Sequence, residues 1–530
     1  MKRKQYILLL ACCSLFASCN FLDEYSQDQA YVTDWKDLDE LLIGDVYMKV
    51  GATQQYENYS NLGQFLHLVA DEMDERNTGF ATLFDSKYYT FGVYTWQQRT
   101  GLKETYAGDY YTENQTWTEI YRRINVCNNI LKSSESLSRR TQAEEQGYQK
   151  VRGEAHFLRA FYYFWLANVY GQPYDPATAQ EALAVPLKTT ETVEDKKFGR
   201  NTVREAYDLV IGDLRDAERE LTAYGQAQRS IYRVDSVGVQ LLLSRVYLYA
   251  QQWELAAQYA RKVIAQRPAL QNLNQNASPW MSQTNEETLF SMGGDDLPCL
   301  LTDQSHAYKV SAALYNSLAS SDRRKALWFY QRGSFNGLTK RAGRRTSDEE
   351  LIPADAGYNY YYYYNGLMGQ QSPVSSLFWL RTSEAYLNLA EALLMQGQDA
   401  EARNVLNRQR QARYVLGAAP LVRQNTGQAL MEEIRQERRI EFCFEGQRWF
   451  DLRRYRTNPL YPSRIALVHN YTYYTDRGEN TLTHTHQFTL QAEDPSWTLP
   501  LPSEVLDFNT GMPGNNNPWR EYITIDPIAE

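Results

Sequence analysis

The sequence predicts a mainly α-helical protein in which helical hairpins form a scaffold, together with a loop-rich irregular region and a few short strands. Three observations predict this fold class. Apolar residues recur at helical spacing over long stretches. One helix–turn–helix pattern occurs twice, and glycine and proline interrupt the helical periodicity between and after the two copies. With 530 residues, 43% of them hydrophobic, the chain can bury a large core.

Three helices are predicted before the repeated pattern. Residues 117–131 place apolar side chains at helical spacing, and residues 203–221 are amphipathic. Residues 154–170 are apolar on most faces, which is typical of a buried helix. Gly171 and Pro173 follow directly and are common stop signals for a helix.

The repeated pattern is a helix, a tight turn and a second helix. It occupies residues 239–264 and again residues 384–406, and Ala256 aligns with Ala402 where the two helices of each hairpin meet. The pattern resembles tetratricopeptide units of about 34 residues. The predicted helices at residues 154–170 and 203–221 look like a third, interrupted unit. Such hairpins bury their apolar faces by stacking on one another; generic helical hairpins are the alternative.

The remaining segments are irregular. Residues 265–375 contain scattered glycines and prolines, and the last part of the chain is similarly broken by proline. Short strands are expected at residues 471–474 and 483–490. The predicted organisation is a signal peptide (1–18) and one body (19–530), comprising a helical scaffold (about 40–264 and 376–456), loop-rich ligand-binding insertions (about 80–116 and 265–375) and a Pro/Asn-rich C-terminal segment (457–530).

The first residues predict export. Basic residues at positions 2–4 precede an apolar run that is too short to cross a bilayer, which needs about 20 residues. The run ends in Ala17 and Ser18, directly before Cys19. This order resembles the lipobox of bacterial lipoproteins, in which the signal is cut before an acylated cysteine, so we expect lipidation at Cys19. An ordinary secretory signal cut near Ala17 is the alternative.

Composition excludes several function classes. The net charge of −9 and the pI near 5.5 argue against nucleic-acid binding and against electrostatic binding to anionic lipid. Cys127, Cys299 and Cys443 are scattered, so neither a disulfide framework nor a structural zinc site is expected. No cofactor-binding fingerprint is present in the sequence. The 41 Tyr and 11 Trp residues suit wet, partly apolar contacts with sugars, peptides or partner proteins.

Several stretches resemble the SusD/RagB family of outer-membrane lipoproteins of Bacteroidetes. They occur in the family's order at residues 19–24, 154–164, 380–392, 434–454, 499–504 and 515–518. The resemblance implies a helical scaffold of tetratricopeptide-like units and lipid anchoring on the outer leaflet of the outer membrane. It also implies binding of a nutrient, usually a glycan, and partnership with a TonB-dependent transporter of the SusC class. It implies no enzymatic activity.

The block at residues 434–454 is the most specific of these motifs, and it could also suggest catalysis. Glu437, Glu441 and Glu445 share one helix face, and paired carboxylates can perform acid–base chemistry at glycosidic bonds. Arginines lie throughout the block, and their planar forks bind carboxylates. We therefore expect a structural ion-pair network, in which Glu441→Gln harms folding more than binding.

Two other polar clusters could suggest a metal. The acidic residues between positions 71 and 75 could contribute to a calcium site, but they lack the loop of an EF-hand, and a solvated surface is the favoured interpretation. His484 and His486 would share one strand face without a third nearby ligand. No metal site is therefore expected at either cluster.

Exposed aromatic side chains on loops are the expected ligand contacts, because sugar C–H faces stack on aromatic rings. The best candidate is Trp96, since Gly92 is expected to break a helix nearby and polar side chains follow. The candidate ligand-binding residues are Tyr89, Tyr94, Trp96, Arg99, Trp280, Tyr360, Tyr362 and Asn365. Core packing or contact with the transporter is the alternative for each aromatic residue.

The predicted function is that of a surface lipoprotein that binds a nutrient oligosaccharide or polysaccharide and delivers it to a SusC-like TonB-dependent transporter. A peptide-binding member of the same family is the first alternative. A helical glycoside hydrolase and a pure assembly protein are the others. The residues do not indicate which polymer is bound.

Overall fold

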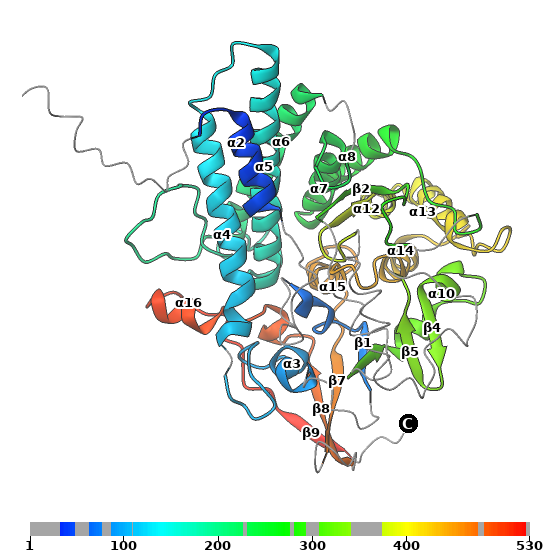
Figure 1. Cartoon of the computed structure of the whole chain (residues 1–530). Coiled ribbons are helices and arrows are strands. Elements are labelled where there is room, and N and C mark those ends of the chain that lie inside the picture. Colours follow the sequence, from blue (N-terminus) through cyan, green and yellow to red (C-terminus); the bar gives the residue numbers. More distant parts are fainter. Residues whose placement is uncertain are drawn as a thin grey trace, which may run out of the picture.

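The computed structural model describes residues 32–47, 63–76, 86–108, 110–225, 230–275, 280–292, 307–340, 374–474 and 482–525. Long helices occupy one side of this part of the molecule, and shorter hairpins lie beside them (Figure 1). Small sheets and short helices fill the remaining side. The protein is therefore mainly α-helical with a few short strands, as the sequence predicts.

The scaffold helices match the predicted segments closely. They are α4 (Tyr110–Ser134), α5 (Gln142–Tyr170), α6 (Val203–Tyr224), α7 (Ser236–Tyr249), α8 (Trp253–Gln266), α12 (Thr382–Met395), α13 (Asp399–Arg413), α14 (Gly427–Glu441) and α15 (Arg448–Arg456).

The two predicted hairpins are α7–α8 and α12–α13, and α8 packs against α12. Ala256 and Ala402 are fully buried within these hairpins, as expected for small residues that let two helices approach closely. Arg245 on α7 donates to Glu384 on α12 at 2.5 Å, which ties the first hairpin to the second. The hairpins therefore stack into one scaffold.

Helices α5 and α6 form the interrupted pair. Each begins with a capping box, in which a threonine and the glutamate three residues later satisfy one another's backbone N–H groups. Arg159 on α5 forms a bidentate pair with Asp213 on α6, at 2.7 and 2.8 Å. Almost every residue in the second half of α5 is buried, which confirms that it is an interior helix.

The described strands form four small antiparallel sheets: β1 (Met73–Glu75) with β3 (Tyr308–Val310), β2 (Thr288–Ser291) with β6 (Trp379–Arg381), β4 (Phe329–Arg332) with β5 (Phe335–Leu338), and β7 (Leu467–Tyr474) with β8 (Leu482–Leu490) and β9 (Tyr522–Ile525). The two strands predicted near the C-terminus are thus confirmed as parts of β7 and β8. They lie beside α3 at the lower end of the molecule in Figure 1.

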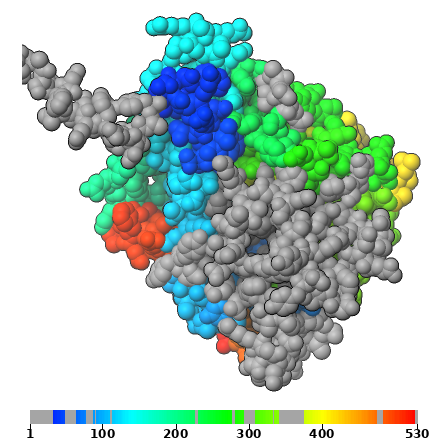
Figure 2. Space-filling model, viewed as in Figure 1, coloured from blue at the N-terminus to red at the C-terminus, as the bar shows by residue number. Residues whose placement is uncertain are grey.

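Short helices complete the described part. They are α2 (Trp35–Leu41), the π-helix η1 (Leu42–Val46), the 3-10 helix η2 (Gln64–His67), α3 (Ser86–Tyr94), α9 (Ala312–Ser317), α10 (Arg323–Trp328), the 3-10 helix η5 (Pro495–Trp497) and α16 (Ser503–Phe508). Helices α2 and α16 lie on the surface, dark blue and red in Figure 2.

Among the described residues, no helix is long and apolar enough to cross a membrane. Cys19 and the predicted signal peptide lie outside the described residues, as does Cys299. Cys127 and Cys443 are free thiols buried in the core, and burial raises the pKa of both. They pack as small hydrophobic side chains, as predicted.

Candidate functional site

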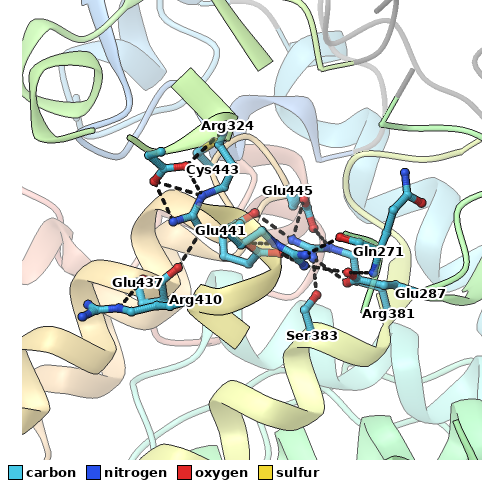
Figure 3. A network of polar contacts seen from close by, with 12 residues as sticks. Gln271, Glu287, Arg324, Arg381, Ser383, Arg410, Glu437, Glu441, Cys443 and Glu445 are labelled. Carbon is cyan, nitrogen blue, oxygen red and sulfur yellow. Dashed lines mark hydrogen bonds and ion pairs between the residues drawn. The ribbon is translucent and has the colours of Figure 1, made fainter. Parts of the chain in front are cut away.

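The charged residues of the block 434–454 lie at the centre of a buried ion-pair network. Glu441, at the end of α14, accepts from Arg381 at 2.5 Å, from Arg324 at 2.8 Å and from Arg413 at 2.8 and 2.9 Å. These arginines come from three other elements and converge on one carboxylate (Figure 3). The network therefore joins α14 to α10, α13 and the start of α12.

Neighbouring carboxylates are engaged in the same way. Glu437 accepts from Arg410 at 2.8 Å and pairs with Arg324 at 2.7 Å. Glu445 accepts from Arg381 at 3.0 Å and from the Lys340 ammonium at 2.6 Å. The prediction that all three glutamates share one helix face is wrong for Glu445, because α14 ends at Glu441 and Glu445 lies in the turn that follows. All three are nevertheless buried, and each has at least two cationic partners.

A second cluster extends the network into α15. Arg454 forms a bidentate pair with Glu391 on α12 and also donates to Asp451 at 2.8 Å. Arg438 on α14 donates to the same aspartate at 3.1 Å and to Asn388 at 2.7 Å. These contacts fix α12, α14 and α15 relative to one another.

The electrostatics of Glu441 oppose a catalytic role. Burial raises the pKa of this carboxyl, but Arg413, Arg381 and Arg324 outweigh burial and hold the pKa well below its ordinary value. A general acid in glycoside hydrolysis needs a raised pKa. The predicted structural role of this block is confirmed.

Trp96 and Tyr94 were predicted to be exposed on a loop, and this exposure is wrong. Each is only 1% exposed, and both rings stack on His469 with centroids 4.2 Å apart. The Trp96 indole N–H also donates to the Val69 carbonyl at 3.0 Å. Both rings pack in the core between α3 and β7 and present no open face to a sugar.

The physical reason lies in Gly92, which was expected to break a helix. Residues Ser86–Tyr94 instead form α3, and Gly92 lets this helix touch the following turn. A Cβ at this position would lie 2.6 Å from the Arg99 carbonyl and 2.8 Å from the Leu102 nitrogen. The glycine is required for close packing, so the segment folds inward.

The other predicted contacts do not form one site among the described residues. Trp280 is 1% exposed and lies between the guanidinium groups of Arg381 and Arg413, 5.3 and 5.0 Å from its ring centre. Its expected exposure is therefore wrong as well, because the network uses it as a cation–π surface. Arg99 is partly exposed and pairs with Glu113 at 2.7 Å. Tyr89 lies on α3.

Four predicted side chains cannot be placed. They lie outside the described residues and comprise Tyr360, Tyr362, Asn365 and the side chain of Tyr89.

The acidic cluster near position 71 was expected to be a solvated surface, and this is wrong for two of its members. Glu72 is buried and accepts from the Phe444 backbone N–H at 3.1 Å. Glu75 is buried and accepts from the Thr472 backbone at 2.8 Å. Asp71 receives a bidentate Arg448 fork at 2.7 and 2.8 Å. The cluster ties β1 to β7 and to α15.

Burial and the adjacent Asp71 raise the pKa of Glu72 to about 8. The described residues contain no group of three or more His, Cys, Asp and Glu side chains arranged to hold a metal ion. His484 and His486 do share one face of β8, with ring centres 4.6 Å apart.

Exposed aromatic rings lie at a place that the sequence did not indicate. We define the aromatic row as Trp519, Tyr106, Tyr473, His484, His486 and Tyr522. Tyr106 follows α3, two strands of the C-terminal sheet carry Tyr473 and the histidines, and Trp519 and Tyr522 flank the start of β9. Trp519 is 48% exposed, Tyr522 45% and Tyr106 37%. These segments are far apart in the sequence, so no local sequence pattern predicts that their rings lie together.

The aromatic row is continuous. Trp519 and Tyr106 lie 4.8 Å apart, and Tyr473 lies 4.7 Å from both histidine rings. His486 stacks on Tyr522 at 3.6 Å with an angle of 12° between the rings. Tyr473 also donates a hydrogen bond to Tyr106, which joins the Trp519–Tyr106 pair to the rings on the sheet. This bond favours a lower pKa for Tyr106, but burial outweighs it and raises the pKa.

Comparison with known proteins covers nearly the whole chain. A model described as the SusD family matches residues 258–519, and one described as starch-binding associating with outer membrane matches residues 20–248. The chain belongs to the SusD family. Members of this family are carbohydrate-binding proteins associated with the outer membrane.

Several relatives of this SusD family protein span most of its length. The SusD-like protein P2 of Formosa agariphila is 25% identical over 446 residues, covering 76% of this chain and 79% of that protein. A SusD-like protein of Bacteroides ovatus is 22% identical over 476 residues, covering 77% and 81%. The crystal structure of a putative sugar binding protein from Bacteroides vulgatus shares the fold, with a TM-score of 0.66, 21% identity and coverage of 92% and 99%.

The region that matches the SusD family model contains the helices joined by the ion-pair network. The SusD family model includes α12, α14 and α15, the helices that the arginines and carboxylates hold together. The motif at residues 434–454 therefore contains residues that build this scaffold.

Proposed function

We propose that this SusD family protein is a surface lipoprotein, anchored through Cys19, that binds a nutrient oligosaccharide or polysaccharide and delivers it to a SusC-like TonB-dependent transporter. The observation that carries this proposal is the match of a starch-binding, outer-membrane family description to residues 20–248 together with the SusD family match to residues 258–519. Acyl chains contribute about 0.8 kcal/mol per buried methylene, so several chains hold a protein on a membrane.

The geometry supports binding without turnover. A glycosidase needs a carboxyl group that can give up and recover a proton near neutral pH. The carboxylates of Glu437, Glu441 and Asp451 are buried and bound by arginines, which keep the pKa of each below its ordinary value. The most acid-rich motif of the chain therefore supports a scaffold.

Binding is tested with the mature chain, produced without residues 1–18 and with Cys19 replaced by serine to keep it in solution. Titration calorimetry against starch fragments, other plant and microbial glycans, and a peptide panel should give saturable heats with a glycan and no release of reducing sugar. A peptide that binds while every glycan fails would support the peptide-binding alternative. Sugar release by the purified protein would contradict the proposal.

Anchoring and partnership need separate measurements in cells. The intact chain should incorporate a labelled fatty acid, and Cys19→Ala should abolish that incorporation. A tagged intact chain solubilised from outer membranes should retain a TonB-dependent transporter through purification. An unacylated Cys19, or purification without a transporter, would contradict the corresponding part of the proposal.

A further inference from the structure

Exposed aromatic rings are concentrated at one place on the described surface. Among the described residues, five large aromatic side chains are at least 37% exposed: Tyr106, Tyr232, Phe508, Trp519 and Tyr522. Three of the five belong to the aromatic row. Grouped exposed apolar rings mark interaction sites, whereas isolated ones are ordinary. The row is therefore a candidate contact surface, and Phe508 and Tyr232 serve as comparisons.

The row rests on a rigid aromatic floor. Phe91 on α3 makes edge-to-face contacts with Tyr106 at 5.2 Å, with Tyr471 at 5.0 Å and with Phe488 at 5.9 Å. Phe91, Tyr471 and Phe488 are fully buried. Phe488 on β8 also pairs with Tyr522 on β9 in the sheet register. The floor fixes the exposed rings before any ligand arrives, which lowers the entropy that binding must overcome.

Tyr106 is held in an uncommon backbone conformation. Its φ of 61° lies in the left-handed region, which disfavours residues with a large side chain. A local turn maintains this conformation, because the Tyr106 N–H donates to the Lys103 carbonyl at 2.8 Å and the Lys103 N–H donates to the Ala107 carbonyl at 3.0 Å. Strained residues that the surroundings over-determine cluster at functional sites. Here the strain places a tyrosine ring beside Trp519.

The polar groups around the row suit neutral hydroxyl groups. The tyrosine hydroxyls can donate and accept, and the Glu104 carboxylate already accepts from Tyr471 at 2.8 Å. Arg520, next to Trp519, is buried and bound by Asp494. Its fork is therefore occupied and does not meet a ligand carboxylate or sulfate. Glu521, on the other side of Arg520, is an exposed acid that would repel an anionic sugar.

We propose that the aromatic row binds neutral oligosaccharides of pyranose sugars, with the faces of Trp519, Tyr106 and Tyr522 stacked on sugar C–H faces and the tyrosine hydroxyls bonded to sugar hydroxyls. This inference rests on the proposed function and gives it a site and a ligand class. Aromatic rings with a polar edge combine apolar area with hydrogen bonding, which is what a hydrated sugar ring offers in return.

The test uses the mature chain and two substitutions in the row, Trp519→Ala and Tyr522→Ala. Phe508→Ala is the matched control, because Phe508 is a 72% exposed aromatic residue at the end of α16 and outside the row. Malto-, cello- and xylo-hexasaccharides are the neutral probes, and an oligogalacturonate of equal length is the anionic probe. Calorimetry gives Kd, and thermal unfolding checks that each variant is folded.

Wild type is expected to bind a neutral hexasaccharide and to ignore the oligogalacturonate. Each row substitution should weaken binding by about tenfold or more, since central aromatic contacts carry most of the energy of an interface. Phe508→Ala should bind as wild type, and all variants should keep the wild-type melting temperature. Ligand should also shift the Trp519 fluorescence, measured as the difference between wild type and Trp519→Ala.

Three results would overturn all or part of the inference, and they differ in whether the proposed function also fails. If wild type binds a glycan and both row variants bind it equally well, the row is not the site and the proposed function stands. If wild type binds no glycan at all, the proposed function fails together with the row. Preference for the oligogalacturonate would overturn the neutral ligand class alone.

Discussion

The ion-pair network around Glu441 and the aromatic row differ in both their chemistry and their burial. The network places carboxylates and guanidinium groups where water cannot reach, and every glutamate of its predicted stripe is paired. The row places Trp519, Tyr522 and Tyr106 at the surface, where these rings are 37–48% exposed. Dense charge in a sequence can therefore belong to the scaffold, whereas the proposed recognition surface is built from flat aromatic side chains contributed by distant segments.

The largest expected effect comes from removing one charge from the network. Glu441→Gln removes the negative charge that three buried arginines share. Because breaking a buried ion pair typically costs 3–5 kcal/mol, we expect the free energy of unfolding to fall by about 4 kcal/mol. Urea unfolding measures this loss. Glu432→Gln, an exposed site on the same helix, is the control and should change stability by less than about 0.5 kcal/mol.

Equal losses for these two variants would remove the contrast between a buried network and an ordinary surface. If Glu441→Gln instead kept its stability and lost glycan binding, the block would belong to the site.

Two tryptophan substitutions, one in the core and one in the aromatic row, compare the same residue type in a buried and an exposed position. Trp96→Ala removes a core ring that stacks on His469 and donates to Val69, and it should cost about 3 kcal/mol of stability. Trp519→Ala removes a half-exposed ring and should cost less than about 0.5 kcal/mol while weakening glycan binding. Chemical unfolding and calorimetry together separate the two effects. Similar stabilities for the two variants would break the distinction between core and surface.

The smallest expected effect concerns a single buried carboxyl group and depends on pH. The pKa of Glu72 is raised to about 8 in the folded protein, so the folded state binds a proton that the unfolded state releases near its ordinary pKa. Glu72 therefore makes stability fall as pH rises from about 4.5 to 8. Glu72→Gln keeps an oxygen for the Phe444 N–H and should be more stable than wild type at pH 8.

Near pH 4.5 Glu72→Gln and wild type should unfold alike, because the carboxyl is protonated in the folded protein. Thermal unfolding at several pH values measures the difference. A constant difference across this range would contradict a role for proton binding.

The sequence predicts the scaffold well, for a clear physical reason. The signals for the scaffold are local in the sequence. They are the apolar spacing in α5 and the small residues Ala256 and Ala402, which are buried where two helices meet. The arginines of residues 434–454 predict a structural role for Glu441, although its partners Arg324, Arg381 and Arg413 come from other elements. The strands β7 and β8 also carry a local pattern of β-branched and aromatic residues.

The site is harder to predict because exposure is a property of the whole fold. Trp96 and Trp280 have polar neighbours in sequence that suggest a surface, but helix α3 and the network cover them. Gly92 illustrates the ambiguity, since the same residue can end a helix or allow close packing. Tyr106, Tyr473 and Trp519 become neighbours only in the folded chain, so no local spacing could have grouped them.

The long reach of these contacts also bears on truncation of the chain. Arg520 donates to the Trp96 carbonyl across 424 positions of sequence, and β9 closes the sheet that supports the row. A chain that lacks its last described residues therefore lacks β9 and the aromatic rings that flank the start of that strand. Truncation before residue 519 would consequently remove Trp519 and Tyr522, two of the three exposed rings of the row, while leaving every scaffold helix from α4 to α15 in the chain.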